Sequence, residues 1–165
     1  MTRAIVSCLI FAAAAVAVVG QMPKYGITVT AEKGVDFSKF KTYSWTKGQP
    51  SPIKTIDAQI TAAVDRELGA LGMMTAASGT ADVQVTYYSL SRTDVNLDAK
   101  ADDKGLRPQY PVGSLMVALL QPRTGKRLLR MRVDKPIDTE PAKLEAAINS
   151  AVTEMFEKYP TRQAK

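Results

Sequence analysis

Apolar and polar residues alternate along several short stretches of the chain. This two-residue period is typical of a β-strand with one buried face, because successive side chains of a strand point to opposite sides. Strands are therefore predicted at residues 27–31, 42–45, 81–90, 113–120 and 126–133. Residues 121–125 contain proline and glycine, so the last two strands are predicted to form a β-hairpin.

Two longer stretches instead repeat their apolar residues every three or four positions. This spacing, from Ile56 to Leu71 and from Leu144 to Tyr159, predicts two amphipathic helices. Thr55 is the predicted N-cap of the first helix, and Gly72 is its predicted C-terminal glycine. Pro141 suits the first turn of the second helix, and Pro160 is expected to stop it.

The predicted order of elements is ββαβββα, which belongs to the α+β class. A sheet with one apolar face and two helices with one apolar stripe each are buried most simply in a two-layer α/β sandwich. We therefore expect a mostly antiparallel sheet with both helices on one face. The polar stretch Ser91–Pro111 is interpreted as a mobile surface loop of about twenty residues, an unusual length in a compact domain. A partial strand extension and a functional loop are alternatives for it.

The N-terminus has the features of a secretory signal peptide. One basic residue, Arg3, precedes an apolar run over residues 4–19, which is shorter than the ~20 residues that a membrane-spanning helix needs. Cleavage is expected after Gly20, so that residues 21–160 form a single domain and residues 161–165 a frayed tail. These features predict an exported protein of the periplasm or cell envelope, with no transmembrane span after cleavage.

The sequence around Cys8 resembles a lipobox, but too few residues precede it for a hydrophobic region, so a lipid anchor is not expected. Without Cys8 the mature chain has no thiol, and the sequence has no histidine at all. The usual zinc ligands and the usual general base are therefore missing, and no metal or cofactor is predicted. The series Asp94, Asn96 and Asp98 is spaced as in a calcium loop, but it lacks the glycine and the final glutamate of that motif, which favours a solvated acidic loop.

Four aromatic residues gather in one short stretch, at Phe37, Phe40, Tyr43 and Trp45. The spacing of the two phenylalanines suits a helical turn, and Tyr43 and Trp45 share one face of the strand that follows. We interpret the stretch as a structural corner whose rings close one end of the core, with Trp45 against the first helix. The alternative is that Tyr43 and Trp45 line a ligand or glycan groove.

Several segments together resemble the bacterial domain of unknown function (DUF) 4136 family. They are the stretch 35–45 (VDFSKFKTYSW), the helix end 68–73 (LGALGM), the strand 81–88 (ADVQVTYY), residues 113–115 with the turn 124–126, and residues 156–160 (FEKYP). The resemblance covers nearly the whole mature chain. It implies a secreted or lipid-anchored envelope protein without an established activity. The chain departs from the family pattern in its poor lipobox and in the basic strand 129–132, where relatives often carry a tryptophan.

Candidate catalytic groups are few. Ser38 and Lys39 are adjacent, but neighbours on an extended chain point apart, so Ser38 is interpreted as a turn or cap hydroxyl. Asp57, Asp65 and Glu67 are placed on the polar face of the first helix and are expected to be solvated. We therefore predict a non-enzymatic domain that binds another envelope component. A hydrolase with a carboxylate or Ser–Lys centre remains the alternative from another class.

Basic residues gather in the predicted hairpin, from its turn into its second strand, and the mature chain has 21 Lys and Arg against 16 Asp and Glu. An anionic lipid or lipopolysaccharide is a second candidate partner for this surface, while nucleic acid fits poorly because no aromatic residues are interleaved with the charges. Ordinary solvated arginines on an open sheet face are the simpler interpretation. The oligomeric state is left open. The candidate contact residues are Arg123, Lys126, Arg127, Arg130 and Arg132.

Overall fold

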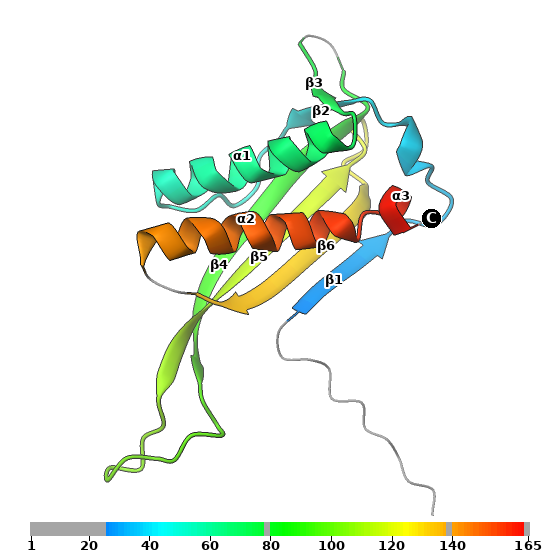
Figure 1. Ribbon diagram of the computed structural model, residues 1–165. Coiled ribbons are helices and arrows are strands. Elements are labelled where there is room, and N and C mark those ends of the chain that lie inside the picture. Colours follow the sequence, from blue (N-terminus) through cyan, green and yellow to red (C-terminus); the bar gives the residue numbers. More distant parts are fainter. Residues whose placement is uncertain (1–25, 78–79, 138–139, 164–165) are drawn as a thin grey trace, which may run out of the picture.

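The computed structural model describes residues 26–77, 80–137 and 140–163. A six-stranded sheet forms one layer, and two long helices lie side by side on one of its faces (Figure 1). The chain therefore folds as the predicted two-layer α+β sandwich. Its strands are β1 (Gly26–Ala31), β2 (Thr42–Trp45), β3 (Met74–Thr75), β4 (Val83–Val95), β5 (Gln109–Leu120) and β6 (Arg127–Pro136). Its helices are the 3-10 turn η1 (Phe37–Lys39), α1 (Lys54–Ala70), α2 (Pro141–Glu157) and α3 (Pro160–Gln163).

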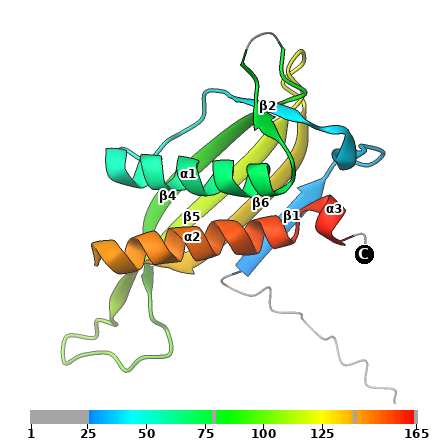
Figure 2. The same ribbon diagram turned by 45° about the horizontal axis from the view of Figure 1, so that its top comes forward.

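The strands are ordered β1-β6-β5-β4-β2-β3 across the sheet. The first four in this order are antiparallel, whereas β2 is parallel to both β4 and β3. Parallel neighbours need a crossover connection, and α1 supplies the one between β2 and β4. Both helices begin at the same end of the layer and run in the same direction, as two views agree (Figures 1 and 2).

The ends of α1 show which local signals the sequence carries. Gly72 has a φ of +80°, and the N–H groups of Met73 and Gly72 donate to the carbonyls of Leu68 and Gly69 at 3.0 and 2.9 Å. This double bond pattern is the Schellman motif, and it confirms the predicted role of Gly72. The predicted N-cap at Thr55 is wrong, because the helix begins at Lys54 and its N-cap, Ile53, has no side-chain capping bond.

The second helix begins with Pro141 in its first turn, as predicted. It ends at Glu157, before Tyr159, and Pro160 opens the short helix α3 instead of simply ending α2. Residues 161–163, predicted as part of a frayed tail, therefore belong to a helix. Arg162 fastens this helix to α1 through Glu67. Residues 164 and 165 lie outside the described part.

The stretch predicted as a mobile loop, Ser91–Pro111, is a strand extension in part, which was the alternative given for it. Strand β4 continues to Val95 and β5 begins at Gln109, so that Thr93 pairs with Pro111 and Asp94 with Tyr110. Only residues 96–108 connect the two strands. This extension, residues 89–113, leaves the helix layer and is called the arm below (Figure 1). Apolar and polar residues do not alternate regularly along the arm, because no helix covers this part of the sheet.

The core lies between the helices and the sheet, where the apolar stripes of α1 and α2 meet alternate residues of the strands. Its largest fully buried side chains include Tyr159, Phe156, Leu68, Leu119, Leu129 and Met131. None of the helices in the described part of the chain is both long and apolar enough to cross a membrane. The predicted signal segment, its cleavage site after Gly20 and Cys8 lie outside the described residues.

Candidate functional site

An apolar groove of about 450 Å³ lies over the sheet at the end where both helices begin. One wall comes from α1 and the residue before it, with Ile53, Ile56 and Ile60. The facing wall comes from α2, with Leu144, Ala147 and Ile148 among its residues. The sheet forms the floor, where β4 and β5 pass into the arm. Ile53 and Leu90 are each 55% exposed at this groove, so part of its apolar lining is open to solvent.

Two polar side chains of the groove, Lys135 and Ser114, are bound to other protein groups. Lys135 places its Nζ 2.6 Å from Oε1 of Glu154 on α2, and this bond is the main reason that the pKa of Glu154 is lowered. Ser114 donates its hydroxyl hydrogen to Asp134. The groove is therefore suited to a hydrocarbon surface, and it places no pair of carboxylates side by side.

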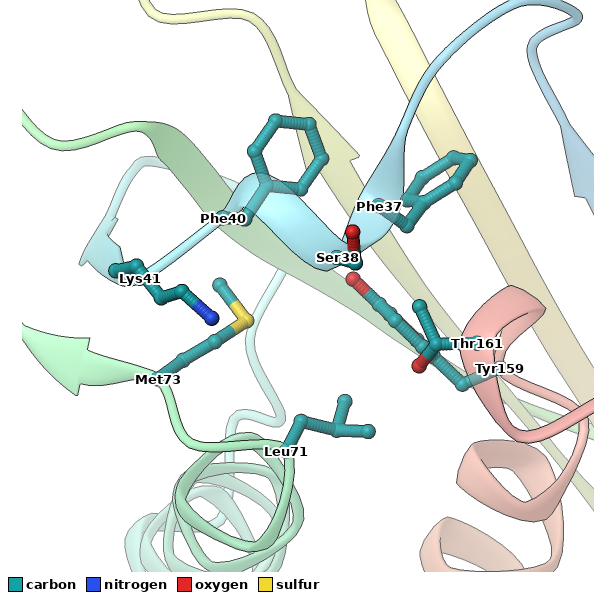
Figure 3. A pocket seen from close by; sticks show the side chains of 8 residues that line it. All are labelled: Phe37, Ser38, Phe40, Lys41, Leu71, Met73, Tyr159 and Thr161. Carbon is teal, nitrogen blue, oxygen red and sulfur yellow. The ribbon is translucent and has the colours of Figure 1, made fainter.

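A second, smaller pocket of about 180 Å³ lies at the other end of the helix layer. Figure 3 shows that η1 and the residues after it contribute one side, the C-terminal end of α1 another, and the start of α3 a third. Tyr159, between α2 and α3, is 1% exposed, and burial raises the pKa of its hydroxyl to about 12. Its lining residues are Phe37, Ser38, Phe40, Lys41, Leu71, Met73, Tyr159 and Thr161.

The four aromatic residues of the predicted corner fall into two groups. Phe37 meets Phe40 and Tyr159 edge to face, at centroid distances of 5.7 and 5.8 Å, beside the small pocket. Trp45 meets Tyr87 of β4 in the same way, at 6.2 Å. Phe37 and Tyr43 are buried, whereas Phe40 and Trp45 are half-buried against the core.

The carboxylates of α1 do not lie on a solvated face, so that prediction is wrong. Asp65 Oδ1 accepts hydrogen bonds from the Tyr43 hydroxyl at 2.8 Å and from the Trp45 indole at 2.9 Å. Asp57 accepts a bond from the Tyr87 hydroxyl, and the pKa of Tyr87 is raised to about 12, first by burial and then by this bond. The helix turns these carboxylates to the sheet because tyrosine and tryptophan present polar groups there.

Glu67 is the third of these carboxylates, and it is 7% exposed. It accepts bonds from Thr153 of α2 at 2.7 Å and from Arg162 of α3 at 3.2 Å. Each candidate acid of α1 thus has its own structural partner. The three do not converge on either pocket, since neither is lined by an acidic residue.

Ser38 and Lys39 have partners outside the small pocket. The Ser38 hydroxyl donates to Oδ1 of Asp36 at 2.6 Å, and Asp36 also accepts from the Ser38 N–H as the N-cap of η1. Lys39 pairs with the same carboxylate at 3.5 Å. Asp36 therefore takes the hydrogen-bonding role that a Ser–Lys centre would give to the lysine.

The five basic residues of the second hairpin are spread from the turn to the middle of the sheet. Arg132 donates to Asp134 at 2.8 and 2.9 Å, and Lys126 lies 2.8 Å from Glu32. Arg130 is half-buried against Met116. Only Arg123 and Arg127 are exposed and, within the described residues, without an ion pair.

Asp102 and Asn96 stabilise turns of the arm. Asp102 accepts bonds from the N–H groups of Lys104 and Leu106, and Asn96 accepts from those of Asp98 and Ala99. Asp94 pairs with Arg92 at 3.0 Å within its own strand. No cluster of three or more Asp, Glu or Cys side chains suited to a metal ion occurs in the described ranges.

The sequence did not indicate the groove or the small pocket. Ile56, Ile60, Leu144 and Ile148 were recognised as members of helical stripes, but a stripe does not show where two helices leave space between them. The mixed lining of the small pocket comes from three separate segments. The motif around Phe37 was the one signal that pointed to its position.

Comparison with known proteins identifies the fold and the family. A search of curated proteins finds no match. A solved DUF4136 family protein from Bacteroides thetaiotaomicron has a TM-score of 0.57 at 14% identity, covering 86% of this chain and 98% of that one. A PDZ domain protein from Parabacteroides distasonis also has a TM-score of 0.57, at 15% identity over 81% of this chain. The chain spans only about a third of that protein, 35%. The family described as "Domain of unknown function (DUF4136)" matches residues 27–161, and the chain belongs to it.

Proposed function

We propose that the protein is a non-enzymatic, exported domain of the cell envelope, and that it holds the acyl chain of an envelope lipid in the apolar groove. The observation that carries this proposal is the groove itself. Its volume of about 450 Å³ falls in the usual range of ligand pockets, roughly 300–1,000 Å³, and its walls are mostly aliphatic. The signal-like N-terminus supports the location.

An acyl chain suits the groove better than a peptide does. A peptide brings backbone N–H and C=O groups that need hydrogen-bond partners once they are out of water. The lysine of the groove is bound to Glu154, and Ser114 donates to Asp134, so these two offer little to such a peptide. A hydrocarbon chain brings no polar group, and burial of its surface against Ile56, Leu144 and Ile148 is favourable.

A bulky residue in the groove tests this proposal. Ala147 lines the groove and is exposed, so Ala147→Trp should fill the space without disturbing the core. Ala146→Trp is the matched control, because Ala146 is exposed on the same helix but does not line the groove. Delipidated mature protein is titrated with palmitate and with phosphatidylglycerol, followed by native mass spectrometry. Binding by the parent and by Ala146→Trp, lost in Ala147→Trp, is expected.

Two results would overturn the proposal. One is a parent protein that binds neither lipid, and the other is equal binding by the two tryptophan variants. Export is tested separately, by measuring the intact mass of the protein recovered from the periplasm. A chain that starts at Gln21 is expected, and a lipidated Cys8 would contradict it.

The hydrolase remains the alternative from another class. The engagement of Asp57, Asp65 and Glu67 with tyrosine, tryptophan, threonine and arginine partners speaks against it. The anionic-surface alternative now depends mainly on Arg123 and Arg127. Sedimentation with anionic liposomes that is lost on Arg123→Glu/Arg127→Glu but kept in Ala147→Trp would favour that alternative.

A further inference from the structure

We propose that the small pocket at the far end of the helix layer is a binding site for a short-chain carboxylate. The carboxylate would accept hydrogen bonds from the Tyr159 hydroxyl and the Lys41 ammonium group. Its short apolar body would lie against Phe40, Leu71 and Met73. This site differs from the groove in position, size and charge, and it does not depend on the proposed lipid binding.

Tyr159 is the strongest observation for a ligand. Its side chain is 1% exposed, yet its hydroxyl has no hydrogen-bond partner among the described residues. A buried hydroxyl without a partner costs about 1–3 kcal/mol, and buried polar groups in native proteins are nearly always paired. Figure 3 shows the ring reaching from the α2–α3 junction toward η1, with its hydroxyl directed into the space that the eight side chains enclose. The missing acceptor is therefore expected in that space.

Packing holds this hydroxyl in place. The ring is stacked on Phe156 at 6.2 Å and meets Phe37 edge to face at 5.8 Å. A ring fixed on two sides cannot turn its hydroxyl to water, so the donor is preorganised for whatever enters the pocket. Because burial raises the pKa of Tyr159 to about 12, the phenol keeps its proton near neutral pH and acts as a donor.

Lys41 gives the pocket its charge. Its ammonium group points into the same space in Figure 3 and, in the described part of the chain, forms no ion pair. Its backbone is fixed at the start of β2, because Asp82 accepts the Lys41 N–H at 2.9 Å and the Thr42 N–H at 2.8 Å. No acidic residue lines the pocket. Two donors, one of them charged, in a lining without a carboxylate favour a negatively charged oxygen ligand.

The remaining lining limits the size of the ligand. Phe40, Leu71 and Met73 offer apolar surface opposite the donors. The volume of about 180 Å³ is less than half that of the groove, about 450 Å³. This space admits a carboxylate with a few carbon atoms and excludes a long acyl chain. It also suits a carboxylate better than a phosphate, whose three or more oxygens would face the apolar wall.

The experiment uses the mature protein and a series of probes of similar size: butyrate, hexanoate, 1-butanol and butylamine. Binding is followed by calorimetry and by the NMR signals of the Tyr159 ring. Saturable binding of the two carboxylates, with none of the alcohol or the amine, is expected. Tyr159→Phe and Lys41→Met should each weaken it by about tenfold, the loss of one charge-assisted hydrogen bond. Lys39→Met is the matched control, since Lys39 pairs with Asp36 outside the pocket.

Thermal unfolding of each variant shows whether a loss of binding comes from the pocket or from a loss of stability. Tyr159→Phe removes an unpaired hydroxyl, so its stability should equal or exceed that of the parent. A clear loss of stability would show that the hydroxyl is bound to water or to protein, and would overturn the proposal. Equal binding by the parent and Tyr159→Phe, or no selectivity for carboxylates, would overturn it too. Ala147→Trp should leave carboxylate binding intact, so failure of the lipid proposal and failure of this one are separately visible.

Discussion

The carboxylate of Glu67 on α1 lies 3.2 Å from the guanidinium of Arg162 on α3. Thr153 of α2 donates to the other oxygen of the same carboxylate at 2.7 Å. One buried acid therefore joins three helices, and it holds the junction that positions Tyr159. The Glu67 side chain is only 9% exposed, so water does not replace a lost partner easily.

Removal of Arg162 should destabilise the fold. We expect Arg162→Ala to lower the free energy of unfolding by about 1–3 kcal/mol, because it leaves a buried carboxylate short of a charged donor. Arg66→Ala is the control: the Arg66 side chain is 52% exposed and its guanidinium lies 4.0 Å from Glu67, so its loss should cost less than about 1 kcal/mol. Urea unfolding of both variants measures the difference. Equal losses would contradict a buried role for the Arg162 pair.

Asp65 should contribute as much to the stability of the fold as a core residue does. Asp65→Ala leaves the Tyr43 hydroxyl and the Trp45 indole without their acceptor, and we expect a loss of about 2–3 kcal/mol. Trp45 is the only tryptophan, so its indole N–H gives one assignable NMR signal. That signal should move strongly in Asp65→Ala and remain unchanged in Asp98→Ala, which alters an exposed residue of the arm. An unmoved signal would refute the bond.

Acid should weaken the protein through Asp134. Burial alone would raise its pKa, but bonds from Arg132, Ser114 and Arg92 outweigh burial and lower the pKa from 3.8 to about 2. A lowered folded-state pKa means that the stabilisation is complete above the unfolded value, near pH 4, and is lost as the pH falls toward 2. The shift corresponds to at most about 2 kcal/mol.

Denaturation midpoints between pH 2 and 6 measure this effect. The parent should lose stability across the window from about pH 4 to 2. Asp134→Asn, which does not titrate, should start less stable and show a flatter profile. Asp98→Asn should keep the slope of the parent. A slope that is the same in Asp134→Asn and the parent would assign the acid sensitivity to other groups.

Gly48 should not tolerate a side chain. A Cβ at this position would collide with the carbonyl oxygen of Tyr87 and the hydroxyl of Thr86, because the segment after β2 runs tightly along β4. We expect Gly48→Ala to cost about 1–3 kcal/mol. Gly69→Ala should instead stabilise α1 by about 0.5–1 kcal/mol, since open space surrounds that position. Thermal unfolding distinguishes the two, and equal melting temperatures would contradict the close approach.

The sequence predicted elements wherever one face of an element is buried. The stripes of α1 and α2 and the alternation in β5 and β6 depend on that single buried face. The arm was predicted as a mobile loop, with a partial strand extension as an alternative, because its residues lie beyond the helix layer and do not show the alternation on which a strand prediction depends. The prediction for Asp57 and Asp65 was wrong because helical periodicity treats every carboxylate as solvated. In the structure, tyrosine hydroxyls and the tryptophan indole of the sheet donate hydrogen bonds to these two carboxylates.

The candidate site was harder to predict than the fold. The groove needs the relative position of two helices, and that position depends on contacts between residues far apart in the sequence. The small pocket needs Lys41, Leu71 and Tyr159 to meet, and no local pattern connects them.

The pairing of β1 with β6 means that β1 can enter the sheet only after β6 has been synthesised. Ile27 lies opposite Val133, so the first strand of the described chain waits for one of the last elements to be synthesised. Until β6 has emerged, β1 has no partner strand in the sheet, and contacts of such long sequence separation form slowly. Completion of the six-stranded sheet therefore requires the chain from β1 through β6.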